Sequence, residues 1–124
     1  MDKFDLEERL INFAVLIIEL ASEMQPTQAG NHLSGQLIRS GTSPALNYGE
    51  AQSAESRKDF IHKMKIVLKE LRESLVCLKI IEKAKLHKKF EKIEKAKIEC
   101  NELISIFVKS IDTAENNLKK KDNI

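Results

Sequence analysis

Positively charged side chains recur at helical spacing in the second half of the sequence. Five of them fall within about 80° of one helix face at 100° per residue, and they extend over about 27 Å at 1.5 Å per residue. These five residues are Lys65, Lys69, Arg72, Lys79 and Lys83. Such a row of cations can contact successive phosphates of a nucleic acid. Few aromatic residues are interleaved with it, so we expect contact with backbone phosphates and not stacking of bases.

Four more lysines continue the positive charge around the next turn and into the following helix. They are Lys88, Lys89, Lys92 and Lys95. Cations at the beginning of a helix oppose its macrodipole, by about a few tenths of a kcal/mol each, so their placement indicates selection for something other than local stability. Two interpretations stay open for all nine cations. They bind the phosphates of a nucleic acid, or they form a solvated face that is partly balanced by Glu82, Glu91 and Glu94.

The sequence contains no recognisable pattern of catalytic or metal-binding residues. The three histidines lie in separate segments, and none has a His or Cys at metal-ligand spacing. Cys77 and Cys100 can meet in an antiparallel helix pair, but apolar-flanked cysteines in a helix are usually small core residues. No histidine stands three residues after a glutamate, which excludes the Glu-x-x-His motif of di-metal bundles. The sequence therefore predicts no enzyme, no catalytic residue, no metal and no cofactor.

Carboxylates near the middle of the sequence are better suited to ion pairs. Arg39 is the only cation between residues 10 and 56. We expect Arg39 to pair with Glu50, Glu70 or Glu73, because a partly buried ion pair fixes how helices pack more than it adds stability.

The composition favours one compact all-α domain over residues 1–124. Four Gly and two Pro are too few for the turns of an all-β protein. No apolar run approaches the ~20 residues of a membrane span, and the acidic beginning of the chain lacks the basic start of a signal peptide. Two cysteines do not make a disulfide framework. We expect a cytoplasmic protein that does not associate with membranes.

Hydrophobic periodicity predicts four helices, at about residues 5–25, 28–52, 57–85 and 90–118. Thr27 is the expected N-cap of the second helix, and Ser56 with Asp59 forms a capping box for the third. The expected apolar anchors of the second helix are Leu33, Leu37, Leu46 and Tyr48. Short connections favour an antiparallel up-down-up-down four-helix bundle, with a tail at about residues 119–124 that frays.

Two stretches depart from a regular bundle. Small residues surround Pro44 in the run 40–45, which predicts a kink near Pro44. This run is either tight packing at the kink or a backbone site for an anion or a partner. In the first helix, Ile11, Val15 and Ile18 form a second apolar stripe beside the core positions. Burial on two sides, either centrally or against another subunit, would account for that stripe.

Charge is distributed unevenly, although the net charge is only +2. Residues 57–97 carry fourteen Lys or Arg against six Asp or Glu, whereas residues 1–56 carry three against eight. Such asymmetry indicates either a nucleic-acid ligand or subunits that pair an acidic face with a basic one.

The sequence resembles the four-helix bundle family of 23S rRNA intervening-sequence (IVS) proteins over nearly its whole length. The resemblance is densest in four segments, which are Arg39-Ser40-Gly41-Thr42-Ser43, Asn47-x-x-Glu50-Ala51, Ser56-x-Lys58-Asp59-Phe60-Ile61-x-Lys63 and Lys69-Glu70-x-x-Glu73-Ser74. A fifth segment, from Asn101 to Phe107, is also similar. Within this pattern we expect structural roles for Arg39, Asn47, Glu50, Ser56, Asp59, Phe60, Glu70 and Glu73.

The resemblance implies a non-enzymatic bundle that assembles as a homopentamer with a basic surface. The family is similar to the accessory variability protein of diversity-generating retroelements, which implies rRNA, other RNA or DNA as ligands and a reverse transcriptase as a partner. The alternative is a structural or protein–protein interaction module that binds no nucleic acid. In that case the lysines of residues 65–83 would pair with acids of the first helix on a neighbouring subunit.

Overall fold

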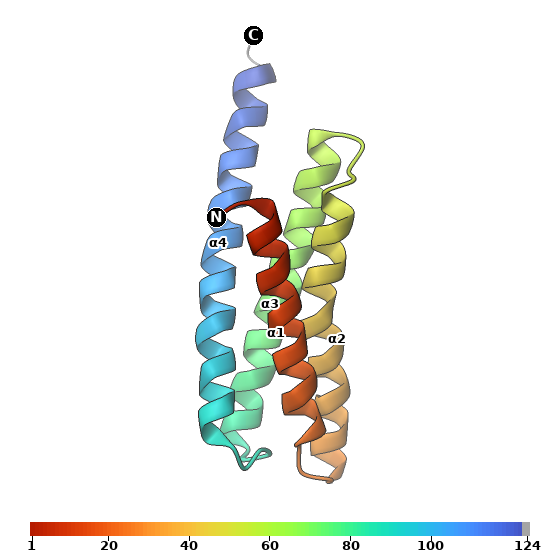
Figure 1. Cartoon of the computed structure of the whole chain (residues 1–124), viewed down its shortest axis with the longest axis vertical. Helices are drawn as coiled ribbons and strands as arrows, with labels where there is room; N and C mark the ends of the chain where they lie inside the picture. Colours follow the sequence, from red (N-terminus) through yellow and green to blue (C-terminus); the bar gives the residue numbers. More distant parts are fainter. Residues whose placement is uncertain (123–124) are drawn as a thin grey trace.

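Four long helices make up the chain. The computed structural model describes residues 1–122, in which α1 spans Lys3–Ser22, α2 Gln28–Ala51, α3 Arg57–Lys83 and α4 Phe90–Asp122. Each helix runs opposite to the one before it and packs beside its neighbours in chain order (Figure 1). Within the described residues, a single isolated bridge between Met24 and His87 is the only β-type pairing. The predicted all-α bundle is confirmed.

The core lies along the axis of the bundle and follows the predicted periodicity. α1 buries its residues at spacings of three and four, and α3 and α4 do the same. Tyr48 and Phe107 meet edge to face, with ring centroids 5.7 Å apart. The prediction for Leu46 is wrong, because this side chain is 71% exposed. α2 instead buries small residues between Leu37 and Tyr48, since its neighbours approach closely there.

The small-residue run of α2 is a packing surface. A Cβ atom added to Gly41 would lie 2.6 Å from Cγ2 of Ile17 on α1, so only glycine fits at this contact. On the other side, the buried Ser74 hydroxyl of α3 donates to Ser40 at 2.9 Å. α2 continues through Pro44 without a break, and the kink stays a prediction. These contacts favour tight packing over a backbone binding site for this segment.

Both predicted N-caps are confirmed, and the capping box is wrong in one detail. Thr27 Oγ1 accepts from the Gly30 amide at 3.0 Å, and Ser56 Oγ accepts from the Asp59 amide at the same distance. The Asp59 carboxylate does not reach back to the Ser56 amide. It accepts from the amide of Glu55 at 3.4 Å, one residue further out of the helix.

Two helix ends differ from the prediction. α1 ends at Ser22 and not near residue 25, because the backbone beyond it joins the α3–α4 turn: the Gln25 amide donates to the Leu86 carbonyl at 3.0 Å. α4 continues to Asp122 instead of ending near residue 118. The fraying of residues 119–124 stays a prediction, and residues 123–124 lie outside the described residues. Among the described helices, none is sufficiently long and apolar to cross a membrane.

Candidate nucleic-acid interface

The cations predicted to contact phosphate lie in two regions. We call the set Lys65, Lys69, Arg72, Lys79 and Lys83 the α3 stripe, and the set Lys88, Lys89, Lys92 and Lys95 the turn cluster. All five side chains of the α3 stripe are exposed. α3 turns its apolar positions toward the core. The residues of the α3 stripe lie about a third of a turn or more away from these positions around the helix, so they are on the outside of the bundle, on the side of α4.

Three members of the α3 stripe converge on one hollow. Lys65, Lys69 and Arg72 line a cavity of about 370 Å³ between α3 and α4, and Leu68 and Ile111 form its apolar part. Lys65 Nζ lies 3.6 Å from Glu115 Oε2. Within the described part of the chain, the other four cations of the stripe have no carboxylate partner. Most of the stripe's charge is therefore available to an anion.

Two members of the turn cluster are already neutralised. Lys89 and Lys92 both pair with Glu23, which follows the last residue of α1, and the Lys92–Glu23 distance is 2.7 Å. The hydrogen bond from Lys89, together with that from Lys92, lowers the pKa of Glu23 to about 2. The same carboxylate raises the pKa of Lys92. These two lysines tie α1 to α4, whereas Lys88 and Lys95 are exposed.

His87 strengthens the same end of the bundle. Its imidazole is buried, and Nε2 lies 3.1 Å from the Leu20 carbonyl oxygen. Nδ1 accepts from the Lys89 amide at 3.0 Å, so Nε2 carries the proton and donates. No pattern in the sequence distinguishes this histidine, because its partners are backbone atoms 67 and 2 residues away.

The residues of the motif form contacts between α2 and α3 and within α2. Arg39 Nη1 donates to Glu70 at 2.9 Å, and the guanidinium also pairs with Glu73, as predicted. Glu50 pairs with Lys63 at 3.1 Å and not with Arg39. Asn47 Nδ2 donates to the Ser43 hydroxyl at 2.8 Å and to the Ser43 carbonyl at 3.0 Å.

Among the remaining motif residues, Ser56 caps the beginning of α3 by accepting a hydrogen bond from the Asp59 amide. The ring of Phe60 packs against the edge of the hydrophobic core. Apart from the Asn47–Ser43 bonds, which lie within α2, these contacts hold helices together or fix a helix end.

The cysteines occupy the core, as the sequence predicted. Cys77 and Cys100 are both free and buried. Cys100 Sγ lies 3.1 Å from the Leu71 carbonyl oxygen, and burial raises the pKa of its thiol to about 12. Burial also raises the pKa of Cys77. Among the described residues, no group of three or more His, Cys, Asp or Glu is arranged to hold a metal ion.

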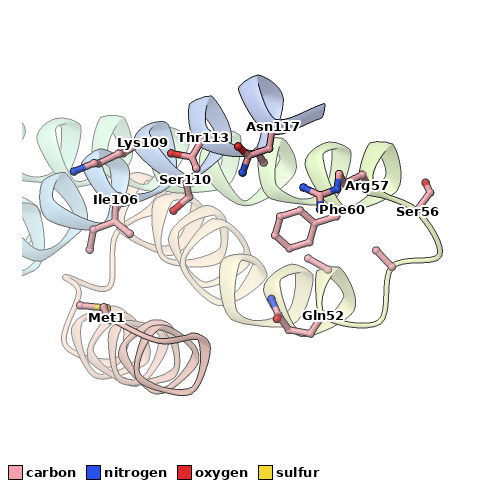
Figure 2. A pocket seen from close by; sticks show the side chains of 13 residues that line it. Met1, Gln52, Ser56, Arg57, Phe60, Ile106, Lys109, Ser110, Thr113 and Asn117 are labelled. Carbon is pink, nitrogen blue, oxygen red and sulfur yellow. The ribbon is translucent and has the colours of Figure 1, made fainter. Parts of the chain in front are cut away.

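A further hollow lies at the open end of the bundle, and the sequence did not predict it. α1 begins short of the end of α4, which leaves a cavity of about 850 Å³ between α4 and the α2–α3 connection (Figure 2). Ser110, Thr113 and Asn117 of α4 line it, and Phe60 turns its ring toward it. Its described lining holds cations, hydroxyls and amides, but no carboxylate, imidazole or thiol. The sequence carried only a weak signal: Ser110, Thr113 and Asn117 lie beside the inward positions of α4 after Phe107, although Ile111 is still buried.

The second apolar stripe of α1 faces solvent in the single chain. Ile11 is 41% exposed, and Val15 and Ile18 are each 49% exposed. Beside this stripe, Val15 and Ile98 line a cavity of about 540 Å³ between α1 and α4. The stripe is therefore unburied within one bundle.

The fold and the site define an all-helical four-helix bundle with an exposed row of cations on its third helix. The model of the family described as "23S rRNA-intervening sequence protein" matches residues 2–109, and the chain belongs to this family. A crystal structure of a protein of unknown function from the S23 ribosomal protein family of Bacteroides thetaiotaomicron is similar to it, with a TM-score of 0.78 and 31% identity. The similarity covers 86% of this chain and 97% of that chain. No functionally curated protein matches the sequence.

Proposed function

We propose that this protein is a non-enzymatic, oligomeric accessory protein that binds RNA or DNA in the cytoplasm through its α3 stripe. The observation that carries the proposal is the convergence of Lys65, Lys69 and Arg72 on one hollow. Four of the five cations of the stripe lack an acidic partner within the described residues. Cations without counter-charges repel one another, and a polyanion relieves that repulsion while it releases its own bound ions.

The arrangement suits the phosphate backbone better than base edges. Val76 and Ile80 are the exposed apolar residues between the cations of α3, and neither can form hydrogen bonds to a base. The exposed Glu73, which also lies between these cations, is already paired with Arg39. A straight helical row about 27 Å long matches several consecutive phosphates. We therefore expect binding that depends on the shape and charge of the nucleic acid and little on its sequence.

The proposal includes assembly into a homopentamer. The α1 stripe and the neighbouring α1–α4 hollow supply an apolar surface that a single bundle leaves exposed. Repetition of a weak phosphate site around a ring would raise the overall affinity through avidity. Light scattering should give a mass of about 70 kDa, five times the 14.1 kDa of one chain.

Matched variants test the interface. The double change Val15→Glu and Ile18→Glu should reduce the mass to that of one chain, because it places charges in the apolar contact. The control is Leu46→Glu on α2, an exposed apolar residue away from this stripe, which should leave the mass unchanged. A monomeric wild-type protein at micromolar concentration would contradict the assembly.

The proposed partners follow from the similarity to the accessory variability protein of diversity-generating retroelements that the sequence resemblance implies. Ribosomal RNA is the ligand that the family description suggests, and other RNA or DNA shares the same phosphate chemistry. A reverse transcriptase is the proposed protein partner. Co-purification of the protein with each of these from cells that express it would distinguish the partners.

A gel shift tests the binding itself. With structured RNA or duplex DNA at ~50 mM salt, the wild-type protein should form a complex that weakens steeply as salt rises. The second candidate function is assembly alone, in which α3 stripe lysines pair with acids on a neighbouring subunit. Absence of any complex at ~50 mM salt, together with loss of assembly when the stripe is neutralised, would establish that alternative.

A further inference from the structure

A single carboxylate stands inside the basic groove between α3 and α4. Two hollows follow one another along this groove, one of about 370 Å³ beside Lys65 and one of about 170 Å³ beside Lys58 and Lys119. Among the described residues that line the two hollows, Glu115 is the only acid, and five residues are cations. Glu115 lies between the hollows, because it lines one of them and pairs with Lys65 of the other.

The Lys65–Glu115 pair contributes little to holding the helices together. Its atoms are 3.6 Å apart, beyond hydrogen-bond distance, and the two side chains are 55% and 39% exposed. An exposed pair of this kind adds little to stability. By contrast, the Lys97–Glu82 pair between the same two helices is 2.9 Å long and about 20% exposed on each side. A contribution to fold stability therefore accounts for the presence of an acid at Glu82 better than at Glu115.

We infer that Glu115 is an electrostatic brake on nucleic-acid binding in this groove. The inference rests on the proposed function, and it concerns the regulation of the same site. Glu115 neutralises Lys65, and its negative charge repels a phosphate that approaches Lys69 or Lys119. For the backbone of a nucleic acid to use the whole groove, the Lys65 ammonium must leave the carboxylate and turn to a phosphate oxygen. The affinity of the wild-type protein for a nucleic acid is therefore lower than it would be without Glu115, because breaking the Lys65–Glu115 pair costs free energy.

The change Glu115→Gln removes the brake and keeps the shape of the side chain. A unit charge at about 6 Å in water changes an affinity about threefold, and the release of Lys65 steepens the log–log salt slope by about 0.7–0.9. We expect Glu115→Gln to bind structured RNA about three- to tenfold more tightly than wild type at ~0.1 M salt. Filter binding across a salt series measures both quantities, and thermal unfolding should be unchanged.

The matched control is Glu50→Gln. Glu50 also pairs with one lysine, Lys63, at 3.1 Å, but on the α2–α3 side of the molecule. Each variant loses one negative charge, so its net charge rises by one. An effect of net charge alone would therefore appear equally in both variants. If the brake is specific to Glu115, the Glu115→Gln variant binds RNA more tightly and with a steeper salt dependence than wild type. The Glu50→Gln variant then binds RNA with an affinity close to that of wild type.

Removal of Lys65 gives a second readout. The change Lys65→Gln should weaken binding less in the wild-type background than in the Glu115→Gln background, because Glu115 already neutralises Lys65 in the wild type. If wild type binds RNA and the Glu115→Gln and Glu50→Gln variants have equal affinities for it, the inference about Glu115 is overturned, whereas the proposed function stands. Absence of complexes with every variant, including Glu115→Gln, would overturn the proposed function itself.

Discussion

Along α3, four cations face solvent without an acidic partner among the described residues, whereas at the turn before α4 two lysines converge on Glu23. Each region holds four lysines, spread over residues 65–83 in the α3 stripe and concentrated in residues 88–95 in the turn cluster. The difference comes from the element on the other side. Among the described residues, α4 presents Ile111 and one acid, Glu115, to the α3 stripe, and Glu115 pairs only with Lys65. The end of α1 presents to the turn cluster a carboxylate that two lysines share. Density of basic residues therefore does not identify an interface, but the absence of nearby acids is a useful guide.

The largest expected effect is the loss of binding when the unpaired cations of the α3 stripe are neutralised. The four changes Lys69→Gln, Arg72→Gln, Lys79→Gln and Lys83→Gln should reduce the log–log salt slope by about 3, which corresponds to about a thousandfold weaker binding at ~0.1 M salt. The free energy of unfolding should change little, because these side chains are exposed and have no acidic partner among the described residues.

The double change Lys89→Gln and Lys92→Gln is the control for that experiment, since it removes two charges of the same sign from the turn cluster, half the number removed from the α3 stripe. We expect it to weaken binding less than about threefold. A larger loss from the turn cluster than from the α3 stripe would reverse the comparison.

The next effect concerns stability at the turn. The change His87→Leu removes the hydrogen bonds to the Leu20 carbonyl and from the Lys89 amide, and should lower the free energy of unfolding by about 1–2 kcal/mol. The control His62→Leu affects an exposed histidine on α3 and should stay within about 0.5 kcal/mol of wild type. Urea unfolding measures both, and equal values would show that the His87 contacts contribute nothing.

A smaller effect of opposite sign is expected at Lys85. This residue follows α3 with a φ of 57°, a left-handed conformation that favours glycine. The change Lys85→Gly should raise the free energy of unfolding by about 0.5–1 kcal/mol and leave RNA affinity within about twofold. A stabilised variant that no longer binds would show that this turn lysine contacts the ligand.

The smallest effect is the dependence on pH at Glu23. Its pKa is lowered to about 2 in the folded chain, so the stabilisation that it provides is present above its ordinary pKa of 4.5 and is lost as pH falls through about 2. Wild type should therefore be more stable than Glu23→Gln at pH 6, and the difference should disappear at pH 2. Chemical unfolding at several pH values checks the sign. A difference that grows toward low pH would contradict the ion pairs.

Much of the fold could be predicted because the signals are local. Apolar spacing placed the four helices, and Thr27 and Ser56 marked two of their beginnings through side chain–backbone bonds within three residues. The end of α1 could not be placed, because it depends on a backbone bond between Gln25 and Leu86. Leu46 was misplaced for a related reason: the small residues of α2 bring its neighbours close, and they leave Leu46 outside.

The candidate site could be predicted only in part. Helical spacing correctly placed the five cations of the α3 stripe on the outside of one helix. Which cations have acidic partners depends on residues 50 to 69 positions away, such as Glu115 for Lys65 and Glu23 for Lys92. Periodicity within one helix carries no information on such contacts, and the two regions of lysine therefore looked alike in the sequence.

Lysine acetylation, read by mass spectrometry with and without structured RNA, tests the central claim most directly because it reports on both regions of the unaltered protein. In the presence of RNA, Lys69, Lys79 and Lys83 should be protected from the reagent, while Lys89 and Lys92 should react as they do in the free protein. Protection of Lys89 and Lys92 with no change at the three α3 lysines would contradict the assignment of the α3 stripe as the interface.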